Sequence, residues 1–356
     1  MILVILSFIF VLGLLIFVHE LGHFAVAKWC GIRVETFSLG FPPKMIGFRK
    51  GETEYCISWI PLGGYVKMAG EKPEEEDIQG RPYEFMSKPI WQRALVIFAG
   101  PAMNYVLTVV LLFAIYFFQG EPINDPSAKI GLVVAGEPAA AAGLQPGDMI
   151  IGVDDSTVAS FNDMYRLITN RPGEQVNLSW LRGSDTMSAF VTTRVDTAMD
   201  MQGEVVQVGK IGVGKLVEYQ PMGLGKAFVE GFLATNEYVA QIFKFLSDVI
   251  TGSVSSKLIG GPIFIAQAAG EAAKQGFVSV LFLAAILSVN LCVVNLVPIP
   301  VLDGGQLLFL LIEKIKGSPV SMRGRAIAQQ IGLVFLILLI IFVTKNDIWR
   351  INIFGW

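Results

Sequence analysis

The only two histidines of the chain, His19 and His23, stand four residues apart in a run that is largely apolar. On an α-helix this spacing puts both imidazoles on one face, about one turn apart, where they can hold a single metal ion. Glu20 follows the first histidine and is placed to act as a general base on a metal-bound water. The pattern H-E-x-x-H therefore predicts a zinc centre that is capable of hydrolysis.

A catalytic zinc ion usually has three protein ligands and one position left for water, so the two histidines need a third partner. Because the chain has no other histidine, the third ligand must be Asp, Glu or Cys. In the apolar stretch 290–305 the only ionisable carboxylate is that of Asp303, and Pro298 and Pro300 should interrupt the helix just before it. Carboxylates at membrane depth are costly, so we predict that Asp303 completes the site. The alternative for this residue alone is a helix cap at the membrane interface.

The elements that position these residues are predicted to be membrane-spanning helices. Of the 356 residues, 53% are hydrophobic and only 16% are charged, against about 25% in a typical soluble domain. A helix needs about 20 apolar residues to cross a bilayer, and four uncharged stretches are near that length: 1–18, 94–118, 277–302 and 326–344. The first has no Lys or Arg before it and is long for a signal peptide, so we predict a span there and not a cleaved leader.

The charge balance and the cysteines exclude two classes of protein. The net charge of −3 provides no basic surface of the kind that binds nucleic acid. The three cysteines are too few and too scattered for a disulfide framework, and we interpret them as small apolar residues.

The distribution of Lys and Arg predicts the orientation of the spans. The segment 28–93 holds ten of these residues and the segment 304–325 holds four, whereas the much longer segment 119–276 holds only eleven. We therefore expect the first two segments on the cytoplasmic side and the long one on the opposite side, with both termini outside. The acidic run 71–77 is interpreted as a solvated linker.

The long external segment is predicted to contain a small soluble domain. Strand-like runs at 129–135, 149–154, 175–182 and 187–194 alternate with a short helix after Glu137 and a second helix at 161–169, and 205–217 could supply a closing strand. This order, with A-x-x-A-G-L-x-x-G-D at its centre, resembles a bacterial, circularly permuted PDZ domain, present once. The run 209–213 (G-K-I-G-V) is a candidate loop for a peptide carboxylate, with a structural strand as the alternative.

The segment 221–276 is predicted to be helical and amphipathic, because large apolar residues recur at spacings of three and four. We expect a helix at the outer membrane–water boundary that braces the PDZ domain, with an ordinary core-facing helix as the alternative. The apolar residues of this pattern are Phe228, Phe232, Tyr238, Val239, Ile242, Phe243 and Leu246.

Five segments together resemble the site-2 proteases, a family of intramembrane zinc metalloproteases, and more closely their bacterial RseP-like members. They are F-V-H-E-L-G-H-F at 17–24, P-L-G-G-Y-V-K-M at 61–68, F-A-G-P-A-M-N at 98–104, the PDZ-like segment, and N-L-V-P-I-P-V-L-D-G-G at 295–305. They occur in the family's order and cover nearly the whole chain. The resemblance implies Zn²⁺-dependent cleavage of transmembrane helices by regulated intramembrane proteolysis, with anti-sigma factors and remnant signal peptides among the substrates.

The resemblance also implies roles for individual residues. His19, His23 and Asp303 would hold zinc, Glu20 would activate water, and Asn295 would bind the substrate backbone. The other residues assigned in this way are Gly40, Phe41, Gly63 and Gly64 for substrate binding, and Gly100, Asn104, Pro298 and Pro300 as structural residues near the site.

A membrane-dipping β-hairpin is expected within 34–68, with strands at 34–39 and 54–60 and turn residues at Pro42-Pro43 and Lys50-Gly51. Its exposed edge would pair with an unwound substrate by β-augmentation. Three features depart from the RseP-like pattern. Gly40-Phe41-Pro42 stands where Gly-Phe-Gly is frequent, Gln306 stands where His often follows Asp-Gly-Gly, and one PDZ domain replaces a tandem pair.

We therefore predict a polytopic α-helical membrane protein of the bacterial inner (cytoplasmic) membrane, with four transmembrane helices, a membrane-dipping β-hairpin and one extracytoplasmic PDZ domain of the α+β class. Its partners would be single-span membrane protein substrates, and the PDZ domain would contact substrates or the C-termini left by an earlier cleavage. Two rivals are a non-catalytic membrane PDZ scaffold with a structural metal, which needs a fourth protein ligand, and a metal transporter, which needs several ligand sets.

The predicted segments follow the chain in order. They are the first span with HExxH (1–27), a cytoplasmic segment with the hairpin (28–92), the second span (93–118), the PDZ domain (119–220), the amphipathic region (221–276), the third span with NxxPxPxLDG (277–305), a cytoplasmic loop (306–325), the fourth span (326–345) and a C-terminal tail (346–356).

Overall fold

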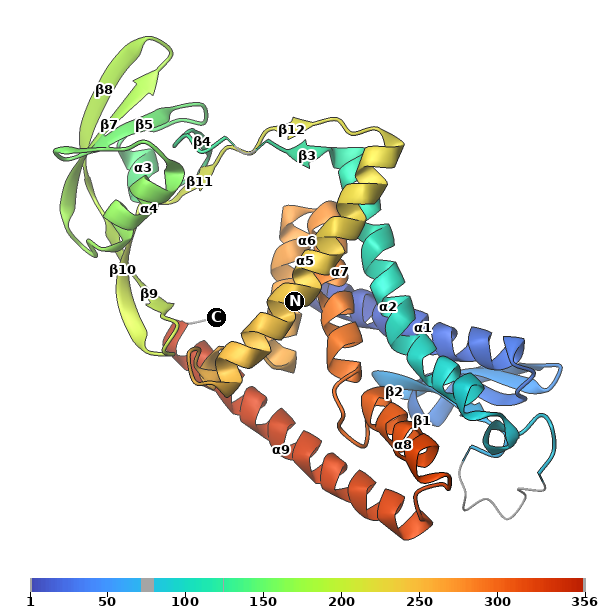
Figure 1. Ribbon diagram of the computed structural model, residues 1–356. Helices are drawn as coiled ribbons and strands as arrows, with labels where there is room; N and C mark the ends of the chain where they lie inside the picture. The colour runs from blue at the N-terminus through green and yellow to red at the C-terminus, as the bar shows by residue number, and fades with distance from the viewer. Residues whose placement is uncertain (1, 72–79, 124, 355–356) are drawn as a thin grey trace. The chain divides into compact units, whose positions relative to one another are not determined.

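The computed structural model describes residues 2–71, 80–123 and 125–354, so most of the predicted linker 71–77 lies outside the described residues. The chain divides into two compact units (Figure 1). One comprises 1–118, 223–248 and 259–349 and carries the long apolar helices. The other comprises 119–222, 249–258 and 350–356 and is mainly β-structure.

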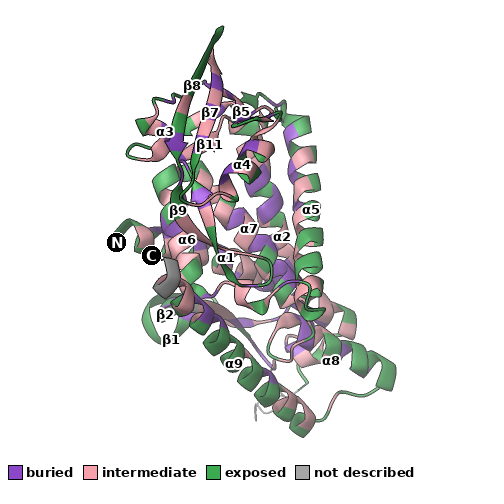
Figure 2. Cartoon of the chain, turned by 90° about the vertical axis from the view of Figure 1, so that its left-hand side faces the viewer, coloured by how far each residue is buried: buried purple, intermediate pink, exposed green. Residues whose placement is uncertain are grey.

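Four helices are long and apolar enough to cross a membrane, which confirms the four predicted spans. They are α1 (Ile2–Trp29), α2 (Ile90–Gln119), α7 (Phe277–Asn295) and α9 (Met322–Phe354). Figure 2 shows that most of α9 is exposed, as expected for a helix that faces lipid. The predicted third segment, 277–305, is divided: α7 ends at Asn295, and α8 (Asp303–Lys316) begins after a turn.

The helices of the membrane unit approach one another closely at small residues. A Cβ atom on Gly22 of α1 would lie 2.3 Å from the carbonyl oxygen of Ala99 on α2, so a larger residue there would separate the two helices. This kind of contact is typical of packing in membranes, where no hydrophobic effect drives helices together. Apolar residues fill the space between α1, α2 and α7, among them Val11, Leu15, Leu112, Ala284 and Ala285.

Two further helices, α5 (Leu224–Ile250) and α6 (Pro262–Gln275), occupy most of the region predicted to be amphipathic. α5 packs lengthwise on α2: a Cβ on Gly231 would lie 2.8 Å from the amide nitrogen of Phe113, and the Tyr105 hydroxyl donates to Asn236 Oδ1 at 3.2 Å. Its place relative to the membrane surface stays a prediction.

The start of α6 is held by a residue from α9. Both carboxylate oxygens of Asp347 are used: Oδ1 accepts from the Gly261 amide at 2.9 Å, and Oδ2 accepts from the amides of Ile263 and Phe264 at 3.0 and 3.1 Å. These are among the amides that an α-helix leaves without a partner at its N-terminus, and a carboxylate is the favoured group there.

The predicted hairpin is more extensive than the sequence indicated. β1 (Val34–Lys50) and β2 (Thr53–Met68) are both long and bent, and segment 36–39 of β1 pairs with 64–67 on one side and with 54–57 on the other. Segment 54–58 also pairs with 44–49. The result is a sheet of four segments in the order 64–68, 34–39, 53–58, 44–50, whose two outer pairs are antiparallel and whose central pair, 36–39 with 54–57, runs in one direction. The predicted strands 34–39 and 54–60 are its two central segments.

The β-rich unit matches the predicted order of elements. Helix α4 (Phe161–Thr169) and strand β7 (Gln175–Arg182) have the predicted bounds. The expected closing strand 205–217 forms two strands, β10 (Val205–Lys210) and β11 (Val213–Lys215), because the chain turns at Gly212, whose φ is +78°. The other elements are β3 (Glu121–Pro122), β4 (Ile130–Val133), α3 (Pro138–Ala141), β5 (Met149–Val153), β6 (Ser156–Thr157), β8 (Asp185–Thr192), β9 (Arg194–Met199) and β12 (Tyr219–Gln220).

The core of this PDZ-like unit is apolar and well buried. A four-stranded sheet of order β6-β5-β7-β8 places Ile150, Leu178 and Trp180 inside, each no more than 1% exposed. Helix α4 begins with a capping box, in which the Ser160 hydroxyl accepts from the Asp163 amide and the Asp163 carboxylate accepts from the Ser160 amide. Two 3₁₀ turns, Phe85–Ser87 and Ser256–Leu258, complete the elements of the described chain.

Candidate metal centre

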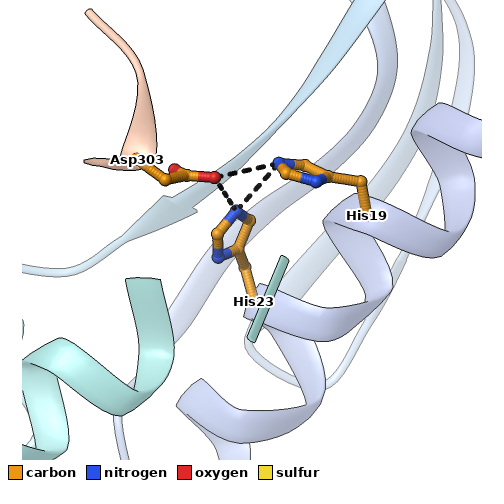
Figure 3. Close-up of side chains that lie close together, drawn as sticks. All are labelled: His19, His23 and Asp303. Carbon is orange, nitrogen blue, oxygen red and sulfur yellow. Dashed lines mark hydrogen bonds and ion pairs between the residues drawn. The ribbon is translucent and has the colours of Figure 1, made fainter. Parts of the chain in front are cut away.

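Two elements that are far apart in the sequence bring three potential metal ligands together (Figure 3). His19 and His23 lie one turn apart on α1, and Asp303 is the first residue of α8. Asp303 Oδ2 is 3.2 Å from His19 Nε2 and 3.6 Å from His23 Nε2, and the two Nε2 atoms are 3.2 Å apart. Within the described part of the chain, this is the one group of three or more His, Cys, Asp or Glu side chains that could hold a metal ion.

The donor set fits zinc. Zinc binds imidazole nitrogen and carboxylate oxygen at about 2.0–2.2 Å in a tetrahedral arrangement, which separates the ligand atoms by about 3.3 Å. The three separations found here are close to this value. Asp303 Oδ2 is also buried without a hydrogen-bond partner among the described residues. A buried carboxylate oxygen that no donor satisfies is expensive unless a cation compensates it.

The ring nitrogens that face away from the site are held by α2. Nδ1 of His23 is 2.8 Å from the carbonyl oxygen of Val96. Because a carbonyl only accepts, Nδ1 carries the proton and the lone pair of Nε2 faces the other two ligands. This contact could not be predicted from the sequence, because any residue type can supply a backbone carbonyl.

Asn104 stands in the same relation to His19. Its side-chain Nδ2 lies 3.2 Å from Nδ1 of His19, while its Oδ1 is buried without a partner among the described residues. Exchanging the amide oxygen and nitrogen, which is an assignment and not an observation in most structures, lets Oδ1 accept from Nδ1 and leaves Nε2 of His19 free for metal. Asn104 is completely buried, and its own carbonyl accepts from Ser288 of α7 at 2.9 Å.

Gly100 is the point at which α2 touches both imidazoles. A Cβ atom at this position would lie 2.3 Å from His23 Nε2 and 2.9 Å from His19 Cε1. Any side chain would therefore occupy the place of the ligands. The site therefore requires glycine at this position. The contact between Gly100 and the two imidazoles cannot be predicted from the residues that surround Gly100 in the sequence.

Glu20 is 9% exposed and lies against the sheet. A Cβ on Gly64 of β2 would lie 2.9 Å from Glu20 Cγ, so β2 passes directly over this carboxylate side chain. Two other residues assigned to substrate binding lie in the same strands: Gly63 of β2 packs on the ring of Phe41, and Gly40 of β1 lies against the backbone of Ser58. An apolar groove of about 170 Å³ lies between the first half of α1 and these residues, and Gly13, Ile16, Gly40 and Gly63 are among its lining.

The approach to Asp303 is an interrupted helix, as Pro298 and Pro300 predict. α7 ends at Asn295, and residues 296–302 form turns that bring the chain to the start of α8. Gly304 and Gly305 allow this turn to close, because Cβ atoms there would lie 2.3 and 2.2 Å from the carbonyl oxygens of Leu296 and Ile299. The partly buried Asn295 immediately precedes this segment and lies eight residues before Asp303 in the sequence.

Comparison with known proteins agrees with this centre. The model of peptidase family M50 matches residues 7–339. The chain belongs to this family. A protein of Agrobacterium fabrum, described as an inferred zinc metalloprotease, is 36% identical over 364 residues, covering 97% of this chain and 95% of the relative. The regulator of sigma-W protease RasP of Bacillus subtilis is 32% identical over 426 residues, covering 98% of each chain.

This M50 peptidase is therefore a zinc metalloprotease with four helices long and apolar enough to span a membrane, and the predictions of zinc, of membrane helices and of enzyme activity are confirmed. A search of solved structures returned the PDZ domain of an SdrC-like protein from Listeria monocytogenes, 22% identical, covering 26% of this chain and 92% of that domain, with a TM-score of 0.21. The PDZ-like character of the β-rich unit rests on the order of its strands and helices.

Proposed function

We propose that the protein hydrolyses peptide bonds within the transmembrane helices of single-span membrane proteins. The observation that carries this proposal is the place of the metal ligands: His19 and His23 lie within a helix long and apolar enough to span a membrane, and Asp303 follows another one after a short turn. Anti-sigma factors and remnant signal peptides are suitable substrates, and one relative is named as a regulator of sigma-W protease.

The proposed roles follow from the chemistry of the residues. His19, His23 and Asp303 would hold the zinc ion, which would lower the pKa of a bound water to about 7 and polarise the scissile carbonyl. The Glu20 carboxylate takes the proton of the attacking water and delivers it to the nitrogen of the leaving amine as the C–N bond breaks. Val96 and Asn104 keep the imidazoles in the tautomer that presents Nε2 to the metal.

Substrate binding is proposed for the sheet that lies over Glu20. A membrane helix hides its peptide bonds, so a protease must hold the substrate in an extended form. The edge of segment 64–68, with Gly63 and Gly64, can pair with such a strand by β-augmentation, and Gly40 and Phe41 lie behind it. Asn295 is the partly buried last residue of α7, and its side-chain amide is proposed to bind the substrate backbone.

We place the protein in the bacterial inner membrane, with the metal centre toward the cytoplasm and the PDZ-like unit outside, on the basis of the Lys and Arg distribution. The PDZ-like unit would contact substrates or the C-termini left by an earlier cleavage. The rival function, a non-catalytic scaffold with a structural metal, needs a fourth protein ligand, and the described residues offer only three at this site.

The test is the variant Glu20→Gln in the full-length protein, reconstituted with a model single-span substrate. We expect cleavage to disappear while zinc binding and thermal unfolding stay as in the wild type, because Gln keeps the shape and loses the base. The matched control is Glu271→Gln, an exposed carboxylate paired with Lys274, which should cleave normally. Cleavage that persists in Glu20→Gln contradicts the assignment of the base.

A further inference from the structure

A buried ion pair joins α2 to the helix that carries Asp303. Arg93 of α2 and Glu313 of α8 are 220 residues apart in the sequence, and their side chains are only 5% and 8% exposed. Arg93 Nη2 donates to Glu313 Oε1 at 2.5 Å and Nη1 donates to Oε2 at 3.1 Å, which is the two-pronged geometry of strong guanidinium–carboxylate pairs. Arg93 Nε also donates to the carbonyl of Lys88 at 3.0 Å, so its orientation is fixed from a second side.

This pair lies on the faces of the two helices that build the metal centre. On α2, Arg93, Ile97, Gly100 and Asn104 follow one another at spacings of four, three and four, so they share one face. Gly100 and Asn104 are the residues that touch the imidazoles. We call this row of residues on one face of α2 a stripe. The ion pair therefore lies at the start of the stripe whose later residues position His19 and His23.

The corresponding stripe on α8 begins at the third metal ligand. Asp303, Gln306, Leu310 and Glu313 are spaced by three, four and three residues. Leu310 is 4% exposed and packs in one cluster with Val96 and Ile97 of α2. The two stripes run in opposite directions, with Arg93 against Glu313 at one end and the imidazoles against Asp303 at the other, about 15 Å along α8 from the ion pair.

A cavity lies beside this interface. Its volume is about 210 Å³, and it is lined by Arg93, Ile97, Gln306 and Leu310, together with Arg325 of α9. Apolar contacts are non-directional, so they set the distance between two helices more than their axial register. A pair with two directed hydrogen bonds constrains both.

We propose that Arg93 and Glu313 form a register clamp that positions Asp303 against the two histidines. They are positioning residues and touch neither the substrate nor the metal. A slip of α8 by one residue along α2 would shift Asp303 by about 1.5 Å, which is enough to take its carboxylate out of ligand distance. Arg325 Nη2, at 3.8 Å from Glu313 Oε2, extends the clamp to α9.

The Arg93–Glu313 pair fixes the axial register of α8 on α2 more than it adds to the free energy of unfolding. Replacing both members of a buried ion pair by apolar residues of similar volume often leaves stability unchanged or raises it. The variant Arg93→Met/Glu313→Met therefore separates the two roles, because it keeps the buried volume and removes the directed bonds. Single variants leave one buried charge alone and serve as the disruptive comparison.

The proposal rests on the proposed function only in taking His19, His23 and Asp303 as the zinc ligands. The experiment uses the full-length protein in lipid nanodiscs and measures zinc affinity by chelator competition, thermal unfolding, and cleavage of a model single-span substrate. We expect the double methionine variant to unfold near the wild-type temperature but to bind zinc roughly 10- to 100-fold more weakly, the range found when groups that orient metal ligands are removed.

Two comparisons complete the test. The exchanged pair Arg93→Glu/Glu313→Arg should recover part of the zinc affinity that either single exchange loses, and Lys274→Met, at the exposed pair with Glu271, should bind zinc as the wild type does. Wild-type zinc affinity in the double methionine variant overturns the clamp, as does an exchanged pair that folds but binds zinc no better than the single exchanges. A wild-type protein that holds no zinc would instead contradict the proposed function.

Discussion

The membrane unit and the PDZ-like unit are held together by different means. The PDZ-like unit has a continuous apolar core, in which Val176, Leu178 and Trp180 are at most 1% exposed. The membrane unit exposes much of its apolar surface, as α9 illustrates in Figure 2, and its interior around the metal centre relies on glycine contacts and a few polar groups. We therefore expect the removal of a large side chain to destabilise the PDZ-like unit most. In the membrane unit, the addition of a side chain at a glycine contact should disturb the metal centre most.

The largest expected effect comes from adding one methyl group at the metal centre. In Gly100→Ala the new Cβ would meet His23 Nε2 at 2.3 Å, so the imidazoles must move and zinc binding should fall by about 100-fold or more, with loss of cleavage. The measurement is chelator competition on the purified protein. Gly225→Ala in α5, where nothing lies within 4 Å, is the matched control and should have no effect. Normal zinc binding in Gly100→Ala would contradict the expectation that an added side chain disturbs the metal centre.

Removing a large side chain should have its main effect in the other unit. Trp180→Ala leaves a cavity in the PDZ-like core and should lower the free energy of unfolding of that unit by about 3–5 kcal/mol. Denaturant-dependent proteolysis of the full-length protein measures this loss. Phe190→Ala, at a side chain that is 70% exposed, is the control. Zinc affinity should stay at the wild-type value in both variants, and a parallel loss of zinc in Trp180→Ala would show that the units are not independent.

A smaller effect is expected where a polar group orients a ligand without touching the metal. Asn104→Leu removes the hydrogen-bond partner of His19 Nδ1 and should weaken zinc binding by roughly 10-fold, with less change in unfolding temperature than in Trp180→Ala. Asn236→Leu, at an exposed amide on α5, provides the control. If Asn104→Leu binds zinc as tightly as the wild type, the ring of His19 is held by something else.

The smallest effect concerns the pH dependence of the PDZ-like unit. Arg182 donates to both carboxylate oxygens of Asp148 at 2.8 Å, and this pairing holds the pKa of Asp148 below its ordinary value of about 4. Because the folded pKa is the lower one, the stabilisation is complete above pH 4 and is lost as the pH falls below it. Asp148→Asn should therefore unfold at a lower temperature than the wild type at pH 6, and the difference in unfolding temperature should be smaller at pH 3. An equal difference at both pH values would contradict the pairing of Asp148 with Arg182.

The helices, the strands and the metal ligands could be predicted from the sequence. The pattern of each element lies within a short segment, and the chain offers few other residues that could serve as ligands. The H-E-x-x-H spacing places two imidazoles on one helical face, and Asp303 follows from the absence of other carboxylates in its apolar stretch. α4 and β7 carry clear turn and periodicity signals at both ends.

The remaining features depend on contacts between distant segments. The carbonyl of Val96 and the pair Arg93–Glu313 involve residue types that occur throughout the chain, and only the fold selects the ones that meet. The bends in β1 and β2 allow one segment to pair on both edges, which periodicity cannot reveal. The break in 205–217 depends on the left-handed turn at Gly212, and a glycine in such a pattern is compatible with a straight strand as well.

The carboxylate of Asp347 has a consequence for biogenesis. It comes from α9, which is synthesised well after α6, yet it satisfies the amides of Gly261, Ile263 and Phe264 at the beginning of α6. During translation the ribosome releases α6 more than eighty residues before this partner appears. The start of α6 therefore remains solvated or frayed until α9 has been synthesised and inserted, and this part of the helix bundle reaches its final form only then.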